Sequence, residues 1–370
     1  MKKTAVIIGV VIAVLVGGYV LYRSFFSSTS YGSVNINISA IDEKSVAVCR
    51  DKSGHPRIVC LAETLKKTVS GDLLARLQPA YSVADAQKWS NFPPAGYKNR
   101  VGVTLDKFSN EQLAVVKAIL KEAAGTAANE GYDELEQILN DDDFLKANIT
   151  GSDGGFSSGN FHLAFLGNPA DAGTWQLYFG GHHLAVGMTY RDGALIGATP
   201  SFRGVEPFEK FAQNNRENQP MKQEQDAFAA MLNALDENER AAAKLSQTFT
   251  DILAGPQKDA NFPAAPSGLK ASDLSREKQA LVIKAIETYV ADAADSDAAT
   301  IIEKYRRELA DTFIAFSGTT DQNTVNDYVR IDGPSVWIEI SWQKAASWNG
   351  IHPHSVWRDK RNDYGGNLSK

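Results

Sequence analysis

Five of the six histidines fall in three stretches with strand-like patterns, and imidazoles grouped in this way are typical metal ligands. His352 and His354 lie two residues apart in IHPHSVWRD, so a strand turns both to one face. His182 and His183 are adjacent after a Gly-Gly pair, so a regular strand turns only one of them to that face. His162 opens the apolar segment just upstream. We expect His352, His354 and either His182 or His183 to bind a Zn²⁺ or copper ion, with His162 as a fourth ligand or as support for the ligands. A metal-free ligand cluster and structural histidines are the alternatives.

Three charged residues near the histidines are candidates for catalysis. Glu206 and Asp359 can each act as the general base toward a metal-bound water, whose pKa a zinc ion lowers to about 7. Arg358 can hold an anionic substrate by a bidentate contact, or it can pair with Asp359 or Asp363 and lock the C-terminal tail. Four tryptophans at the same end predict core packing, with a sugar or peptide platform as the alternative: Trp337, Trp342, Trp348 and Trp357.

The first residues of the chain predict a membrane anchor. Lys2 and Lys3 precede an apolar run of 17 residues from Ala5 to Leu21, which is short for a membrane span but long for a signal peptide. The two lysines favour a cytoplasmic N-terminus, so we expect a single-pass protein of the bacterial inner membrane with its bulk in the periplasm. A secreted protein, cleaved near Ser28, is the alternative.

Charge and cysteine usage narrow the expected partners. The net charge of −6 argues against a nucleic-acid partner, which leaves the membrane and an envelope protein complex as the expected ones. Cys49 and Cys60 bracket a Ser-Gly turn symmetrically, which predicts a β-hairpin closed by a cross-strand disulfide. Such a bond fits an oxidising compartment.

Two similar stretches organise the rest of the chain. Both begin Asn-Phe-Pro, at Asn91 and Asn261, and continue into amphipathic helices with matching segments QLAVVKAI and QALVIKAI. Ser109 and Gln112 form a capping-box pattern at the start of the first helix. In each half, strands separated by a glycine turn follow the helices. This pattern predicts an ancient duplication, with chance similarity between helices as the alternative.

The predicted fold class is therefore α+β. A helical pair followed by an antiparallel β-meander occurs twice, and the two pseudo-symmetric halves enclose a cleft. The expected divisions are an anchor and tether at 1–30, a β-hairpin region with the cysteines at 31–90, a first half at 91–205, a helical connector at 206–255 and a second half at 256–370.

Four stretches together carry a family resemblance. They are WQLYFGGHHLAVGMTY at 175–190, TPSFRGVEP at 199–207, RIDGPSVWIEI at 330–340 and HPHSVWRDKRNDYG at 352–365. Their combination resembles a large bacterial and fungal family that is catalogued only as a domain of unknown function. The resemblance covers most of the chain from about Asn91 onward. It implies that the four stretches belong together, and it implies no activity, substrate or metal.

These observations predict a membrane-tethered, extracytoplasmic metalloprotein that acts as a metal-dependent hydrolase. The alternative is a non-enzymatic metal- or ligand-binding protein, or a scaffold subunit of an envelope complex. The number of ligands separates the two classes. Three protein ligands with an open position indicate an enzyme, whereas four ligands that close the site indicate structure or transport.

Overall fold

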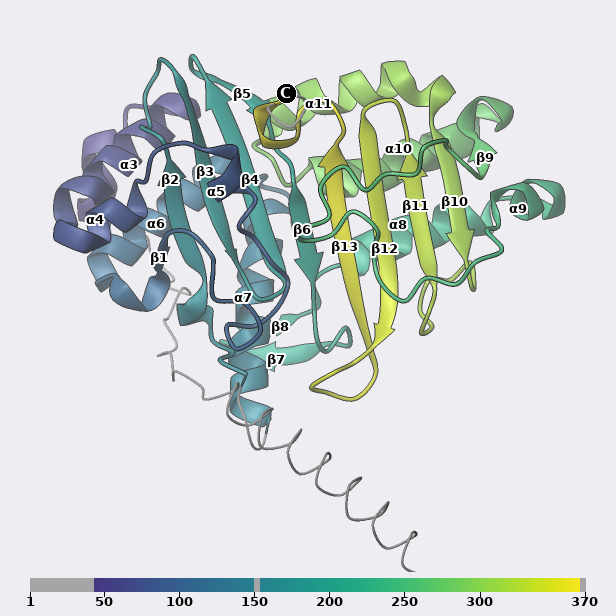
Figure 1. Ribbon diagram of the computed structural model, residues 1–370, viewed down its shortest axis with the longest axis horizontal. Coiled ribbons are helices and arrows are strands. Elements are labelled where there is room, and N and C mark those ends of the chain that lie inside the picture. The colour runs from purple at the N-terminus through teal and green to yellow at the C-terminus, as the bar shows by residue number, and fades with distance from the viewer. Residues whose placement is uncertain (1–42, 150–153, 367–370) are drawn as a thin grey trace, which may run out of the picture.

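A single eleven-stranded sheet forms the centre of the molecule in a computed structural model, which describes residues 43–149 and 154–366 (Figure 1). The strand order is β1-β2-β3-β4-β6-β13-β12-β11-β10-β9, with β5 paired to β4, and every pairing is antiparallel. The strands of the sheet are β1 Val103–Thr104, β2 His162–Leu166, β3 Thr174–Gly181, β4 Leu184–Arg191, β5 Ala194–Gly197, β6 Ser201–Gly204, β9 Leu269–Lys270, β10 Phe313–Ser317, β11 Tyr328–Asp332, β12 Val336–Lys344 and β13 Ile351–Asp359. A separate hairpin pairs β7 Phe211–Gln213 with β8 Arg216–Asn218.

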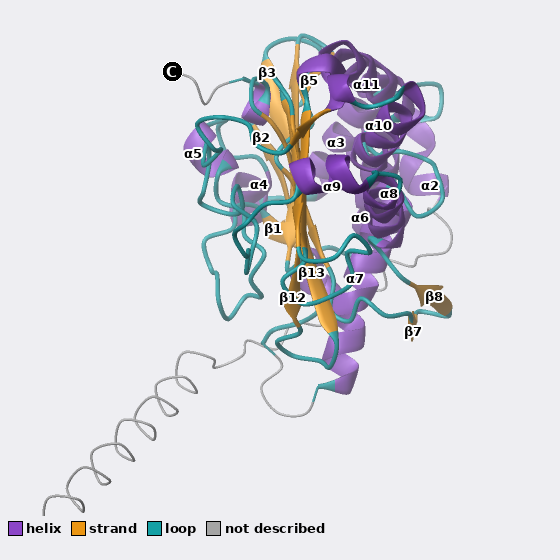
Figure 2. Cartoon of the chain, turned by 90° about the vertical axis from the view of Figure 1, so that its right-hand side faces the viewer, coloured by secondary structure: helices purple, strands orange, loops and turns teal. Residues whose placement is uncertain are grey.

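The two faces of the sheet carry different covers. Figure 2 shows the sheet edge-on, with α3, α6, α8, α10 and α11 on one face, and α4, α5 and long loops on the other. We call these the helix face and the loop face. The α-helices are α2 Glu43–Val46, α3 His55–Thr68, α4 Gly71–Leu77, α5 Val83–Ala86, α6 Asn110–Ala123, α7 Gly131–Asn148, α8 Lys222–Asn233, α9 Glu237–Ala243, α10 Arg276–Val290 and α11 Asp295–Glu308.

The predicted α+β class is confirmed, and the same order of elements occurs on both sides of the sheet. The first half runs β1-α6-α7-β2-β3-β4 and the second runs β9-α10-α11-β10-β11-β12. The predicted capping box of Ser109 and Gln112 starts α6, and the hydroxyl of Ser275 caps α10 by accepting from the N–H of Lys278. The strand after each helical pair bonds back to the short strand before it. The duplication and the pseudo-symmetry themselves stay predictions.

The cysteine pair forms the predicted disulfide, but the predicted β-hairpin is wrong. Cys49 lies in a 3-10 turn and Cys60 lies within α3. Pro56 stands at the start of α3, where a missing N–H costs no hydrogen bond. The buried residues of this helix recur at helical spacing, which outweighs the symmetric placement of the cysteines: Ile58, Leu61, Ala62 and Leu65.

Two further divisions of the chain can be compared with the structure. The expected connector at 206–255 is helical over α8 and α9 only, because the β7–β8 hairpin precedes them. The expected anchor lies outside the described residues. Among the residues that are described, no helix has the length and apolar character needed to span a membrane.

The seam between the halves lies where β6 meets β13. β6 also pairs with β4, so this short strand joins the first-half meander to the last strand of the chain. Three of the four C-terminal tryptophans are at most 1% exposed, which confirms core packing for Trp337, Trp342 and Trp357. The same seam brings the separate histidine stretches together at one end of the sheet.

Candidate metal centre

Three imidazoles converge at the seam. The Nε2 atom of His352 lies 2.8 Å from Nε2 of His354 and 3.1 Å from Nε2 of His183. All three residues are buried, with at most 6% of their surface exposed. Within the described part of the chain, they form the single group whose ligand atoms approach closely enough to share a metal ion.

The spacing of the nitrogens fits a small metal ion. Three ligands of a tetrahedral zinc site, with Zn–N bonds of about 2.05 Å, stand roughly 3.3 Å apart. The observed separations need to open by only a few tenths of an ångström to reach that value. The Nε2 atom of His352 faces two other nitrogens. A ring nitrogen of a neutral histidine has either one proton or one lone pair, so it can form only one good hydrogen bond with them. A central cation accepts all three lone pairs.

The electrostatics of the site keep two of the imidazoles, His183 and His352, neutral. Burial is the largest cause that lowers the pKa of His183 and His352 well below the usual value, and the neighbouring histidines lower it further. A metal binds the unprotonated imidazole, so these nitrogens offer lone pairs at neutral pH.

Strand geometry explains why these three histidines meet. His352 and His354 alternate with Pro353 along β13 and share one face, as predicted. His183 occupies the two-residue turn between β3 and β4 with a φ of 57°, a left-handed conformation that is uncommon outside glycine. The preceding glycines do not form this turn. Gly181 instead lies against the ring of Phe161, where a Cβ would come within 2.7 Å.

Gly204 makes the convergence sterically possible. It pairs directly with His354 across β6 and β13, and its N–H donates to the carbonyl oxygen of His183 at 2.8 Å. A Cβ at this position would lie 2.9 Å from Cδ2 of His183 and 3.1 Å from Cδ2 of His354. The two rings therefore occupy the space that any larger residue would need.

Carboxylates stand behind the imidazoles, as is usual for histidines that bind metals. The Nδ1 atom of His354 lies 3.1 Å from Oδ1 of Asp251, to which Gln343 also donates at 2.9 Å. The Nδ1 atom of His183 faces Oδ2 of Asp141 at 3.8 Å. Burial raises the pKa of Asp251, but the hydrogen bond with His354 and its charge lower it below the usual value overall. Each of these two imidazoles thus has an oxygen on the side opposite the shared centre.

The comparison with protein families can now be read against this geometry. A family model described as "Protein of unknown function (DUF3500)" matches residues 51–366. The chain belongs to this family. The match confirms the predicted membership of a family of unknown function, and it extends further toward the N-terminus than expected, to include α3. No curated protein and no solved structure matches the chain.

Two of the five predicted ligands in the DUF3500 region lie outside the group. His182 stacks on His183 with 3.6 Å between ring centroids, and its Nδ1 contacts Asp142 at 2.6 Å. Its imidazole therefore supports the ligand ring. His162 pairs with Thr104 and Gly180 on β2. Burial, together with the positive charges of Arg100 and Arg76, lowers the pKa of His162 to about 3, and these cationic neighbours disfavour a metal ion.

The candidate general bases have other partners. Glu206 is 2% exposed, and its Oε1 accepts hydrogen bonds from the backbone N–H groups of Ser347 and Trp348, the latter at 2.6 Å. Asp359 lies on the opposite face of β13 from His354, where Lys304 and Tyr305 donate to it at 2.7 and 2.9 Å. The expectation that Asp359 serves as the base is therefore wrong, because the sheet separates its carboxylate from the imidazoles.

Arg358 is fully buried and bound on three sides. It donates to Asp363 at 2.7 Å, to Asp259 at 2.5 Å and to the carbonyl oxygen of Ala254 at 2.8 Å. The expected substrate contact is therefore replaced by the alternative, in which the guanidinium pairs with Asp363 near the C-terminus. Through its bond to Ala254, Arg358 also fixes the loop at 251–254, which carries Asp251.

Glu339 fixes the same loop from β12. Its carboxylate accepts from the backbone N–H groups of Leu253 at 2.8 Å and Ala254 at 2.7 Å, and it is fully buried. Two residues earlier, Asp251 reaches His354. Glu339 and Arg358 together hold the loop in the position from which the Asp251 carboxylate contacts His354.

The acidic run Asp141-Asp142-Asp143 was missed as part of the site. Three consecutive aspartates suggest a solvated surface, yet here they are 0%, 1% and 7% exposed within α7. Asp143 accepts hydrogen bonds from the N–H and hydroxyl of Ser158. Asp142 faces His182, and Asp141 faces His183. Asp251 was missed as well, because its loop carries no motif.

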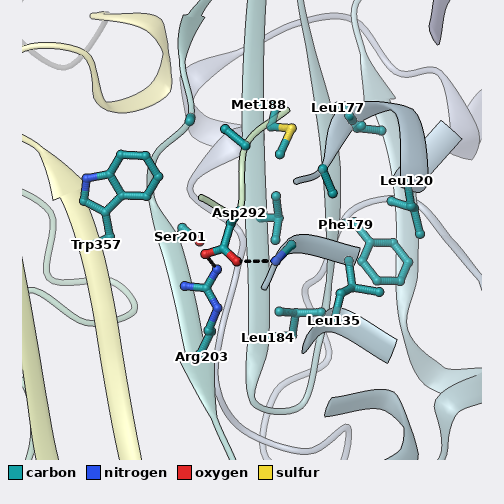
Figure 3. A pocket seen from close by; sticks show the side chains of 16 residues that line it. Leu120, Leu135, Leu177, Phe179, Leu184, Met188, Ser201, Arg203, Asp292 and Trp357 are labelled. Atoms are coloured by element: carbon teal, nitrogen blue, oxygen red, sulfur yellow. Dashed lines mark hydrogen bonds and ion pairs between the residues drawn. The ribbon is translucent and has the colours of Figure 1, made fainter. Parts of the chain in front are cut away.

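A small cavity on the helix face does not offer a second reactive site. Figure 3 shows Arg203 pointing toward Asp292, which also accepts from the N–H of Gly131 at 2.7 Å. Arg203 bonds Glu134 of α7 at 2.5 Å as well, so it ties β6 to α7 and to the turn between α10 and α11. The cavity volume is ≈ 30 Å³ and its lining is mainly apolar, so it has room for little more than one water.

Proposed function

We propose that this protein binds a divalent metal ion, with Zn²⁺ as the best fit, through the Nε2 atoms of His183, His352 and His354, and that it acts as a metal-dependent hydrolase. The convergence of three buried imidazoles carries this proposal. Three histidines with no fourth protein ligand in the described part of the chain support an open coordination position, as in catalytic zinc sites. Bound zinc lowers the pKa of a water to about 7 and supplies a nucleophile. Copper is the alternative ion for three imidazoles.

Asp251 is the residue best suited to pass protons between this centre and solvent. Its side chain is 43% exposed, whereas those of Asp141 and Asp142 are 0% and 1% exposed. Its lowered pKa leaves the carboxylate ionised at neutral pH. The contact with His354 places it one imidazole away from the shared centre.

A non-enzymatic role is the second candidate, as a metal carrier or a scaffold in an envelope complex. The burial of all three imidazoles favours it, because a substrate has narrow access to the metal position. For either role, the Cys49–Cys60 disulfide supports an oxidising compartment. We therefore keep the proposal of a membrane-tethered protein with its bulk in the periplasm.

Metal analysis of the purified protein tests the proposal. We expect about one equivalent of zinc, lost on replacing both His352→Ala and His354→Ala, and a melting temperature that chelators lower. The matched control is His162→Gln, which changes a half-buried histidine outside the group and should keep the metal. Protein without stoichiometric metal, whose melting temperature ignores chelators, would contradict the proposal.

Activity separates the two candidate roles. Metal-dependent hydrolysis of an activated ester such as 4-nitrophenyl acetate, with a rate that rises as pH approaches about 7, is expected for the enzyme. Stoichiometric metal without such hydrolysis would favour the carrier or scaffold.

A further inference from the structure

A concave surface lies between the C-terminal half of α7 and the β12–β13 loop. It is a cleft with a volume of ≈ 510 Å³, within the usual size range of ligand pockets. Phe144 of α7, Phe211 of β7 and Trp348 of the β12–β13 loop line it together with Glu209 and Lys210. Its larger volume distinguishes it from the small cavity behind β6, which measures ≈ 30 Å³.

Shared groups fix this cleft to the metal centre. Trp348 precedes His352 by four residues on the same hairpin, and Phe144 follows Asp141 by three residues, one helical turn along α7. Glu206 connects the two sides, because its carboxylate holds the N–H of Trp348 while its own N–H donates to Asp141 at 3.1 Å. The cleft and the imidazoles are thus held by one set of buried contacts.

The aromatic rings form a preassembled surface. The ring of Phe144 contacts Phe211 with 5.0 Å between centroids and Trp348 with 5.3 Å in an edge-to-face arrangement. Phe144 and Trp348 are only half-buried, unlike Trp337, which is fully buried. Ring surface is therefore open to a ligand.

The charge available in the cleft is negative. Glu209 is exposed, and its carboxylate stands over Gly350, where a Cβ would lie 2.7 Å from Oε1. Among the described residues, no ion-pair partner approaches Glu209. Lys210 is already paired with Glu217 at 2.6 Å. A carboxylate with no ion-pair partner beside partly exposed aromatic rings is the combination that attracts an organic cation.

We propose that this cleft binds the ammonium group, quaternary or alkylated, of an organic cation. The ring faces stabilise the positive charge, and Glu209 neutralises it at the rim. That such a molecule is also the substrate of the metal centre rests on the proposed metal function. Cation binding itself rests on the cleft alone.

Calorimetric titration with choline tests the proposal, with 3,3-dimethyl-1-butanol as the uncharged molecule of the same shape. We expect choline to bind at least about tenfold more tightly than the alcohol, since cation–π contacts depend on charge. Trp348→Ala should weaken choline binding by about tenfold or more, while Trp348→Phe, which keeps a ring, should weaken it less. Glu209→Gln should weaken it severalfold, and the effect should shrink at high salt.

The control variant is Glu237→Gln, which removes the same charge from an exposed position on α9 and should leave binding unchanged. Equal binding of choline and the alcohol, or no binding of either, would overturn the proposal. The metal-site variant with His352→Ala and His354→Ala separates the two claims. If it binds choline but no metal, and wild type does the same, the metal function fails while the cation site stands.

Discussion

Replacing Gly204 with alanine should weaken metal binding at the proposed centre without replacing any of its ligand residues. An added Cβ would lie 2.9 Å from Cδ2 of His183 and 3.1 Å from Cδ2 of His354, whereas ordinary van der Waals contact begins near 3.4 Å. The rings must therefore retreat by about 0.5 Å and about 0.3 Å. Neither can do so freely, because His182 stacks on the first ring and Asp251 bonds the second.

The displacement is large on the scale of metal coordination. Zinc–nitrogen distances in zinc sites stay within about 0.2 Å of their standard value, so a ring shift of about 0.5 Å moves at least one nitrogen out of bonding distance. We expect Gly204→Ala to weaken zinc binding by at least about tenfold. Crowding in a closely packed region should also lower the free energy of unfolding of the metal-free protein by roughly 1–3 kcal/mol.

Competition titration against a zinc-sensitive dye, together with urea unfolding, measures both effects. The matched control is Gly187→Ala on β4, where the nearest atom to an added Cβ is the amide nitrogen at the end of the Gln176 side chain, at 3.1 Å, and no histidine ring is near. That variant should bind zinc like wild type. The reasoning would be refuted if Gly204→Ala bound zinc with wild-type affinity, or if both variants lost it equally.

Two further predictions concern positioning and pH. Glu339→Gln should lower zinc affinity about tenfold, because an amide cannot accept from both backbone N–H groups through which Glu339 holds the loop of Asp251. The control is Glu308→Gln, which changes a carboxylate bound to Ser335 and should leave zinc affinity unchanged. His162 has a pKa of about 3 in the folded protein against 6.5 otherwise, so the unfolded chain binds more protons and stability falls as pH drops below 6.5. Between pH 6.5 and 5 this loss is about 2 kcal/mol, and urea unfolding of His162→Gln should show a correspondingly shallower pH dependence; an unchanged slope would contradict this account.

The sequence was most informative where a short pattern determines local geometry. The H-x-H spacing of His352 and His354 places both imidazoles on one face of any strand, and the capping box at Ser109 marks a helix start. The same alternation shows that Asp359 cannot face them, because it lies an odd number of residues from His354. Patterns of spacing thus carried both the correct part of the site and the means to correct it.

Tertiary pairing supplied what these patterns could not. The choice of His183 over His182 depends on a left-handed turn residue, which the adjacent glycines did not predict. Asp251 reaches the site only because Glu339, 88 positions away, binds the backbone of its loop. The aspartates of α7 look solvated in sequence, since nothing local shows that a strand turn will cover them.

The position of the proposed metal centre at the seam would link metal binding to the assembly of the two halves. His183 and its partner Asp141 come from the first half, whereas His352 and His354 come from the last strand of the second. Each half alone therefore holds fewer than three ligands, so high affinity requires β6 to be paired with β13. Because a ligand that binds only the assembled state stabilises it by mass action, metal binding would add to the stability of this seam in particular. Hydrogen exchange of the β6 and β13 amides should then slow on metal addition more than that of the outer strands β2 and β10.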